Sequence, residues 1–205
     1  MEPPVRLGKG QIERASEVLS RAFRDDPLSV YLFPDPVERE ENMPRVFRSM
    51  LSYGHLYGGA VVSPNLEGVV VWIPSERTHH TLWRDIRSGN TTMLFSIGRK
   101  AAVRWKALGA YVGAIKKRHV PTAYCYGLLL AVDPVYQGKG YGGALLRAVL
   151  SGADREHRPC YLETMSERDI SFFEHFGFRV VEEGLVPGTE LRVWGMMRDE
   201  KGRGK

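Results

Sequence analysis

The sequence has little cysteine and no long apolar run. Its two cysteines, Cys125 and Cys160, lie in apolar segments without nearby metal-ligating partners, so we interpret both as small buried hydrophobic residues. His79 and His80 likewise have no further ligand at useful spacing, and we expect no metal. No run of about 18 apolar residues is present and the first residues, MEPPVRLGKG, are polar, which argues against a membrane span and a cleaved signal peptide. We expect a cytoplasmic protein that does not bind membranes.

An arrangement typical of nucleic-acid binding is also missing. The formal net charge is +5, but part of this excess lies in a short basic tail, 199–205, which has no apolar residue to pack and is expected to be frayed. The other basic residues are scattered apart from Lys116, Lys117 and Arg118, and no ladder of aromatic residues accompanies them. We therefore expect no nucleic-acid partner.

The length and composition predict one globular domain. The chain has 205 residues, of which 43% are apolar and 26% are charged, and these values are typical of a protein with a single core. We expect this domain to span 1–198, with its parts assigned by apolar periodicity and turn residues. These parts are a helical region over 10–56, a hairpin over 59–73, a helical insertion over 78–118 and a core over 123–198.

Several elements are predicted more closely. In the first region, one helix ends before the proline-rich string DDPLSVYLFPDP and a second begins with Pro36 at its first position. The hairpin turns at 64–65, and the insertion is expected to form two helices separated at 89–90. The almost wholly apolar run 123–132 predicts a central strand buried on both faces. A helix, a strand, a short helix and two strands follow it.

The segment YQGKGYGG, 136–143, lies between this strand and the next helix, a place where glycine-rich loops approach phosphates. Gly138, Gly140 and Gly143 satisfy the dinucleotide-binding spacing G-x-G-x-x-G. However, five residues separate the strand from Gly138, and too few residues follow the loop for the rest of a doubly wound sheet. A nucleoside-triphosphate loop fails as well, because Asp133 and Gly140 stand where it needs a glycine and a serine or threonine.

A third interpretation takes the longer string LAVDPVYQGKGYGGALL, an apolar strand followed by V-x-P-x-x-Q-G-x-G-x-G and a helix. This string resembles the pyrophosphate-binding loop of the GCN5-related N-acetyltransferases (GNAT), whose backbone amides hold the diphosphate of acetyl-coenzyme A (acetyl-CoA). The residues give the physical reason, since glycines allow close approach and a helix N-terminus attracts an anion. LETMSERDISFFEHFGF and the final strand LRVWGMM also resemble the family, and the order of these segments is most similar to its puromycin N-acetyltransferase branch.

The resemblance implies a fold and a set of cofactor contacts. The fold is a single α/β (α+β) domain whose mixed, mostly antiparallel sheet of about six or seven strands is flanked by helices. Acetyl-CoA would lie between the strand ending at Val132 and the strand ending at Glu163. The implied cofactor residues lie along the central strand, the glycine loop and the following short helix: Leu130, Ala131, Val132, Gln137, Gly138, Lys139, Gly140, Tyr141, Gly142, Gly143, Asp169 and Phe173.

Three residues of this set are open to a second interpretation. Lys139 adds charge at the loop or is simply a solvated lysine. Asp169 stands where the family often has a cofactor-binding asparagine; an ionised aspartate cannot donate that bond, and we expect it to cap the helix ISFFEHF instead. Phe173 stands where the family usually has a tyrosine that protonates the leaving thiolate. Because a thiol with a pKa of about 8.5 is a tolerable leaving group, this change weakens catalysis without excluding it.

Attack of an amine on a thioester needs a group that removes a proton from the amine. Glu163, at the carboxyl end of a strand beside the loop, is the first candidate, and its alternative role is to hold the site in shape. Asp25 and Asp26 are the second candidate, of which we favour Asp26, and their alternative role is to cap the turn at Pro27. Aromatic residues expected either to line the acceptor pocket or simply to pack are Tyr31, Phe33, Tyr53, Tyr57, Trp83 and Tyr124.

The predicted function is N-acetylation. The chain would transfer an acetyl group from acetyl-CoA to a primary amine of a small molecule by direct attack, since Cys125 and Cys160 lack an adjacent base and disfavour an acyl-enzyme. The helical insertion over 78–118 favours a covered pocket and hence a small acceptor. Two alternatives stay open: a module that binds acyl-CoA with little or no catalysis, motivated by Phe173, and an acetyltransferase acting on proteins or peptides. The sequence also leaves open whether the chain is a monomer or a homodimer.

Overall fold

The computed structural model describes residues 2–200, so the last part of the predicted basic tail, 201–205, lies outside the described residues. Its helices are α1 (Ile12–Ala22), α2 (Pro27–Leu32), α3 (Pro36–Tyr57), α4 (Leu82–Ser88), α5 (Asn90–Ser96), α6 (Gly98–His119), α7 (Tyr141–Arg155) and α8 (Arg168–His175). Its strands are β1 (Val5–Arg6), β2 (Gly59–Val62), β3 (Gly68–Pro74), β4 (Cys125–Val132), β5 (Cys160–Thr164), β6 (Arg179–Leu185) and β7 (Arg192–Arg198). Short 3-10 turns at Lys9–Gln11, Ser75–Arg77 and Pro134–Tyr136 complete the described elements.

The strands form one sheet of seven strands in the order β1-β2-β3-β4-β5-β7-β6. The pair β4–β5 is parallel, and every other neighbouring pair is antiparallel. The predicted fold class, a mixed and mostly antiparallel sheet flanked by helices, is therefore confirmed. The last strand, β7, lies between β5 and β6 and places Gly195 beside Glu163.

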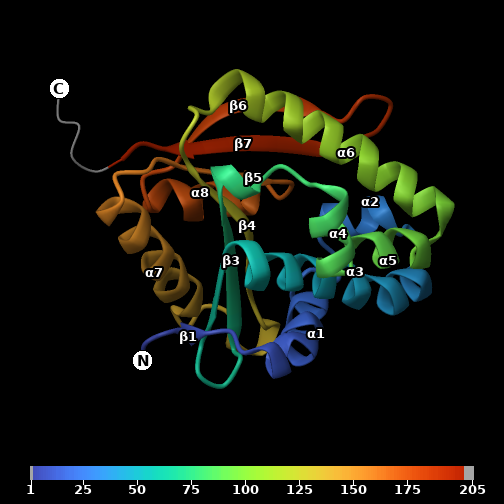
Figure 1. The fold of residues 1–205 in the computed structure, drawn as a ribbon, viewed down its shortest axis with the longest axis horizontal. Helices are drawn as coiled ribbons and strands as arrows, with labels where there is room; N and C mark the ends of the chain where they lie inside the picture. The colour runs from blue at the N-terminus through green and yellow to red at the C-terminus, as the bar shows by residue number, and fades with distance from the viewer. Residues whose placement is uncertain (1, 201–205) are drawn as a thin grey trace.

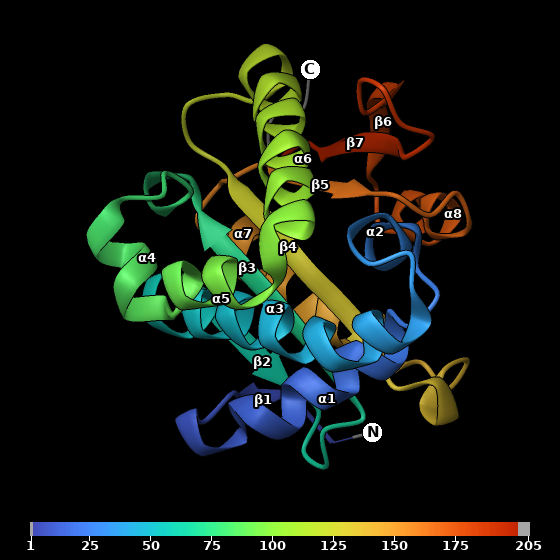
Figure 2. The same cartoon turned by 90° about the vertical axis from the view of Figure 1, so that its right-hand side faces the viewer.

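Helices cover both faces of the sheet (Figures 1 and 2). α7 and α8 lie on one side of the central strands, where Leu145, Leu146 and Val149 of α7 pack with Val70 of β3 and Phe173 of α8. α1 and α3 lie on the other side, over residues of β3 and β4 that alternate with the first set. α6 crosses this second face and packs against β5 and β7 in a third apolar cluster. The second face therefore has a helical roof.

Local sequence signals account for most element boundaries. The carboxylate of Asp35 accepts hydrogen bonds from the amides of Val37 and Glu38, both at 2.9 Å, and Pro36 takes the first helical position of α3 as predicted. The hairpin β2–β3 is confirmed, with its turn over 63–67. None of the described helices is long and apolar enough to cross a membrane.

Two boundary predictions are wrong. The segment after Asp26 is not a simple break, because Pro27 starts the short helix α2. The insertion forms three helices instead of two, because Gly98, like Gly89, adopts a left-handed conformation with φ of 80° and ends the preceding helix. The additional corner turns α6 back across the sheet, which is what covers the second face.

Candidate active site

The glycine loop joins β4 to α7 and presents its backbone amides outward. Gly138 and Gly140 have φ of 74° and 86°, in the left-handed region that favours glycine. Among the described residues, no acceptor pairs with the backbone amides from Gly138 to Gly143. Successive free amides at the N-terminus of a helix form an anion-binding site, so this loop suits the diphosphate of a coenzyme A derivative.

Side chains anchor the loop at both ends. At its start, the carboxylate of Asp133 forms an ion pair with Arg21 of α1 at 2.6 Å. Gln137 donates a hydrogen bond from Nε2 to the carbonyl of Val132 at 3.1 Å. At its end, the hydroxyl of Tyr141 donates to Glu67 at 3.3 Å. Lys139 is exposed and donates to the carbonyl of Val135 at 3.1 Å, so its ammonium already lies at the loop. The amides are therefore held in place without a ligand.

The sheet opens beside this loop. β4 and β5 pair only over Cys125–Gly127, and a register shift in the pairing of β3 with β4 falls immediately after Gly127. From Leu128 to Val132 one edge of β4 has no strand partner, so half of its amides and carbonyls face the gap. The predicted burial of this strand on both faces is wrong. Only Cys125, Leu129 and Ala131 of β4 are fully buried, because neighbouring residues of the strand line an open cavity.

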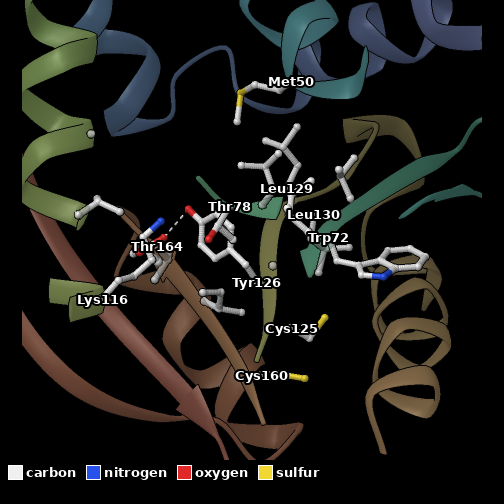
Figure 3. A pocket seen from close by; sticks show the side chains of 18 of the residues that line it. Met50, Trp72, Thr78, Lys116, Cys125, Tyr126, Leu129, Leu130, Cys160 and Thr164 are labelled. Atoms are coloured by element: carbon white, nitrogen blue, oxygen red, sulfur yellow. Dashed lines mark hydrogen bonds between the residues drawn. The ribbon is translucent and has the colours of Figure 1, made fainter. Parts of the chain in front are cut away.

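A cavity of about 1100 Å³ occupies the gap and continues beneath the helical roof. Figure 3 shows Lys116, Tyr126 and Thr164 along one side of it and Met50 above. Cys125 and Cys160, buried as predicted, lie side by side at its far end. The lining is mostly apolar, which is usual for a site that takes a small ligand.

Glu163 extends from β5 into this cavity. Its Oε2 accepts a 2.7 Å hydrogen bond from the hydroxyl of Tyr126, while the buried Oε1 has no hydrogen-bond partner among the described residues. Burial raises the pKa of the Glu163 carboxyl, whereas the ammonium of Lys116 and the hydroxyls of Tyr126 and Tyr161 lower it. The result is a carboxylate whose Oε2 is held by Tyr126 and whose buried Oε1 has no hydrogen-bond partner, which disfavours the ionised form and makes the group a better proton acceptor.

Asp26 and Asp169 both line the cavity and come close enough to interact. Asp26 caps α2 by accepting from the amide of Leu28 at 2.9 Å, so the predicted capping role is confirmed. Burial raises the pKa of Asp26 to about 6, the Leu28 amide lowers it, and the nearby charge of Asp169 raises it further. Asp25 points outward and pairs with Arg39 at 3.6 Å.

The predicted capping role of Asp169 is wrong. Glu167 holds the N-cap position of α8, and Asp169 lies inside the first turn. Its Oδ2 instead accepts from the hydroxyl of Thr164 at 3.3 Å, which ties the start of α8 to the end of β5. Burial raises the pKa of Asp169, an effect that Thr164 and Arg168 reduce. The aspartate therefore faces the cavity rather than the helix end.

Comparison with known proteins identifies the domain. Residues 101–180 match the family model described as acetyltransferase (GNAT) domain. This region, from α6 to the start of β6, is similar to a GNAT acetyltransferase domain. An uncharacterized N-acetyltransferase of Schizosaccharomyces pombe is 25% identical over 181 residues, which cover 84% of this chain and 72% of that protein. These matches support an acyltransferase.

Solved acetyltransferases share the fold. A Corynebacterium glutamicum structure described as histone acetyltransferase HPA2 and related acetyltransferase superimposes with a TM-score of 0.66 at 18% identity, covering 97% of this chain and 96% of that one. Arylalkylamine N-acetyltransferase 2 of Aedes aegypti gives a TM-score of 0.62 at 13% identity, covering 96% and 97%. At these identities the likeness shows the shared fold.

Phe173 of the acetyltransferase is buried at the edge of the cavity. Its ring packs against Phe172 and Phe178 at centroid distances of 5.3 Å and 5.8 Å. The position predicted for a thiolate-protonating tyrosine thus borders the cavity but carries no hydroxyl. No group of three or more potential metal ligands occurs within residues 2–200.

The predicted aromatic lining is only partly brought together. Tyr53 and Tyr124 line the cavity. Tyr31, Phe33 and Tyr57 pack in or against the core under α1 and α3, and Trp83 is exposed. Tyr126 and Lys116 line the cavity but are not predicted from the sequence. Tyr126 lies in an apolar strand and Lys116 in a run of basic residues, and neither pattern indicates a site.

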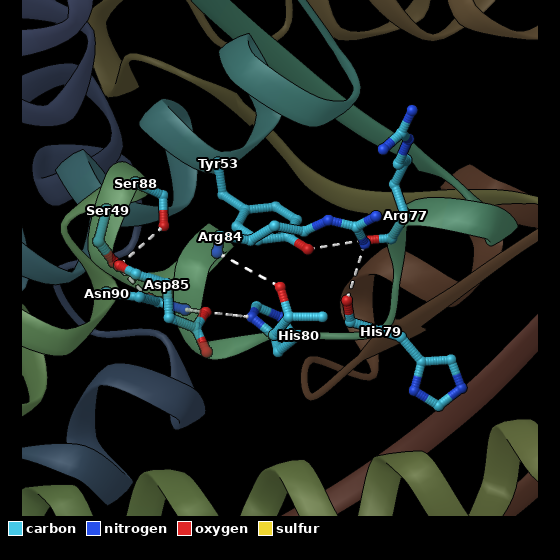
Figure 4. A network of polar contacts seen from close by, with 10 residues as sticks. Ser49, Tyr53, Arg77, His79, His80, Arg84, Asp85, Ser88 and Asn90 are labelled. Carbon is cyan, nitrogen blue, oxygen red and sulfur yellow. Dashed lines mark hydrogen bonds and ion pairs between the residues drawn. The ribbon is translucent and has the colours of Figure 1, made fainter.

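A polar network under α3, α4 and α5 shapes another part of the wall (Figure 4). His80 Nδ1 and Asp85 are 2.7 Å apart, and Asn90 donates to the same carboxylate at 2.9 Å. The Tyr53 ring stacks on His80 with centroids 4.6 Å apart, and Ser49 donates to Asn90 at 3.1 Å. The network links α3, α4 and α5 through side-chain hydrogen bonds.

The raised pKa of Asp26 predicts that Asp26→Asn stabilises the folded chain, and that the gain in stability depends on pH. In the folded chain the pKa is about 6 and in the unfolded chain about 4, so folding favours the neutral acid and ionisation costs stability as the pH rises between them. An asparagine retains the cap and is never charged. We expect Asp26→Asn to raise the free energy of unfolding by about 1–3 kcal/mol at pH 7.5 and by much less near pH 4, measured by denaturant titration.

Asp25→Asn is the matched control, because its side chain is 83% exposed. This control should change the stability little and show no such trend with pH. A gain for Asp26→Asn of equal size at both pH values would contradict a buried, ionisable Asp26.

Proposed function

We propose that the chain is an N-acetyltransferase that moves the acetyl group of acetyl-CoA directly to a primary amine of a small molecule. The observation that carries this proposal is the Glu163 carboxylate, held by Tyr126 on one oxygen and free on the other, inside a roofed cavity beside the opened edge of β4. The helical roof of α3, α5 and α6 favours a small acceptor over a protein segment. The order of the Leu-Glu-Thr end of β5 and the Arg-x-Trp of β7 supports placement in the puromycin N-acetyltransferase branch.

Binding of the cosubstrate is assigned to backbone groups. The amides from Gly138 to Gly143, together with the dipole of α7, would hold the diphosphate, and the ammonium of Lys139 would add charge there. The free edge of Leu130, Ala131 and Val132 would pair with the amide groups of the pantetheine arm. When bound, acetyl-CoA supplies an activated acyl group, and the chain supplies its orientation.

Proton removal is assigned to Glu163. Burial raises the pKa of its carboxyl, and Lys116 and Tyr126 offset only part of this rise. The group is therefore a stronger base than a surface carboxylate. Asp26 is the alternative base. The buried Phe173 has no proton to give, so the thiolate leaves without help from that position.

The proposed function is tested by measuring free thiol released from acetyl-CoA with a panel of primary amines and with lysine-containing peptides. Acceptor-dependent release with small amines, together with an acetylated product of the expected mass, is the expected result. Release only with the peptides would assign the protein-directed alternative instead. Release with none of them would contradict N-acetylation.

Tyr126→Phe should move the pH profile of the reaction. Removing the hydroxyl removes a hydrogen bond that favours the ionised form of Glu163, so the pKa of Glu163 rises. We expect the acidic limb of kcat/KM to move up by about one pH unit, because a hydrogen bond to a charged group is worth about 1.5–3 kcal/mol. Activity should fall clearly on the acidic side of the profile and little on its alkaline side. Tyr124→Phe, two residues earlier and just before β4, should leave the acidic limb in place. An unmoved limb in Tyr126→Phe would show that Tyr126 does not tune the base.

A further inference from the structure

Lys116 places a half-buried ammonium in the acceptor part of the cavity. Its Nζ lies 4.1 Å from the centroid of the Tyr126 ring, and Lys116 makes no ion pair with a described carboxylate. A lysine that only covers apolar surface extends its ammonium into water. Lys116 instead directs its charge into the site (Figure 3), where it lies over the Tyr126 ring and can bind an anionic group of a ligand.

Lys116 and Glu163 contact the same tyrosine from different elements. Lys116 on α6 lies over the ring of Tyr126, and Glu163 on β5 accepts from its hydroxyl at 2.7 Å. The positive and negative groups therefore both border the Tyr126 side chain, and Lys116 is near enough to lower the pKa of Glu163. One charge of each sign flanks the place where the acceptor amine must lie.

The acceptor that fits this pair carries both charges itself. An acceptor with only an ammonium is attracted by Glu163 and repelled by Lys116, and a second ammonium adds repulsion. An acceptor with a carboxylate a few ångströms from its amine pairs each group with its opposite. Lys106 and Lys117 also line this wall of the cavity and add to its positive side.

We propose that Lys116 is a carboxylate subsite and that the acceptors are amines bearing a neighbouring carboxylate, as in amino acids. This inference rests on the proposed function and adds the class of acceptor. Lys116 binds the carboxylate, and the amine then lies beside the Glu163 carboxylate, which removes the proton before attack. Lys116 makes no bond in the reaction and is a specificity residue.

Matched acceptor pairs test the proposal. Thiol release is measured for 2-phenylethylamine against L-phenylalanine and for 1,4-diaminobutane against L-ornithine, with phenylalaninamide as a third, carboxylate-free compound. The carboxylated member of each pair should have a kcat/KM at least about tenfold higher, the factor expected for one charge-assisted contact. Phenylalaninamide, whose amine is less basic, should not share the preference. If amine basicity alone set the rates, this amide would be the best acceptor, and that result would overturn the proposal.

Variants of Lys116 assign the preference to one side chain. Lys116→Gln should remove most of it through a higher KM for the carboxylated member, whereas Lys116→Arg should retain it. Lys100→Gln removes a charge from the exposed start of α6, outside the cavity, and should change nothing. If Lys116→Gln lowered kcat/KM equally for both members of a pair, Lys116 would act only through Glu163. That result would contradict a carboxylate subsite.

A binding measurement keeps this inference distinct from the proposed function. Calorimetry compares N-acetylphenylalanine with N-acetyl-2-phenylethylamine on the wild-type chain and on Lys116→Gln, without turnover. Tighter binding of the carboxylated product, lost in the variant, supports the subsite even if no tested amine is acetylated. Equal binding of the two products to the wild-type chain overturns it, whatever the activity.

Discussion

Replacing Glu163 by glutamine is expected to lower kcat/KM for the amine by about 10² to 10⁴, the usual contribution of a positioned general base. Glutamine keeps the size of the side chain and can still accept the hydrogen bond from Tyr126, so the cavity should be unchanged. It cannot accept a proton. The measurement is thiol release over a range of pH, and the residual activity should lose the acidic limb that the wild-type chain shows as the pH falls through the raised pKa of Glu163.

Two controls accompany Glu163→Gln. The KM for acetyl-CoA should remain close to the wild-type value, because the loop amides are not altered. Glu174→Gln, an exposed position on α8, should behave as the wild-type chain. Activity of Glu163→Gln within a factor of about three of wild type would remove Glu163 as the base, since a base contributes far more. A large loss in Asp26→Asn would then assign that role to Asp26.

Replacing Gly140 by valine is expected to weaken coenzyme A binding by at least about 100-fold, a loss of about 3 kcal/mol. Gly140 has φ of 86°, a conformation that a β-branched residue adopts only with strain. The valine either displaces the amides that follow it or places its side chain over them. In both cases the diphosphate loses charge-assisted hydrogen bonds. Calorimetric titration with coenzyme A measures the change without any acceptor.

The strain at Gly140 also lowers stability by about 1–3 kcal/mol, so the thermal midpoint of the variant is measured alongside. Gly152→Ala is the matched control, because Gly152 lies within α7 with open space around it. It should bind coenzyme A normally and be slightly more stable. Lys139→Glu reverses an exposed charge without backbone strain and should weaken binding in a salt-dependent way. Unchanged affinity in both Gly140→Val and Lys139→Glu would exclude this loop as the diphosphate site.

Features that depend on neighbours in the chain are predictable from the sequence. Asp35 and Pro36 start α3, the hairpin turns where its Pro-Asn pair lies, and the glycine loop opens α7. In each case the backbone conformation or the cap is set within a few residues. The cofactor part of the site is of this kind, because a strand, a glycine loop and a helix N-terminus are consecutive along the chain.

Predictions fail where two signals of equal strength compete locally. In the sequence, Gly98 fits a continuous helical pattern. In the structure, its left-handed backbone conformation separates α5 from α6. Asp169 stands near the start of a helix and has the residue type of a cap, but Thr164 of the preceding strand binds its carboxylate. The bond to Thr164 exists only once β5 and α8 meet, so the pattern within α8 does not reveal it.

The fold class and the glycine loop could be predicted from the sequence, and Glu163 could be chosen as the first candidate base, because the order of these segments resembles that of the GNAT family. Only the tertiary structure decided what surrounds Glu163. Tyr126 and Glu163 are 37 positions apart and meet because β4 and β5 are parallel neighbours. Lys116 reaches them from a helix that crosses the sheet after the corner at Gly98. Contacts between such distant residues depend on how layers pack, and residue type alone does not encode which surfaces come together.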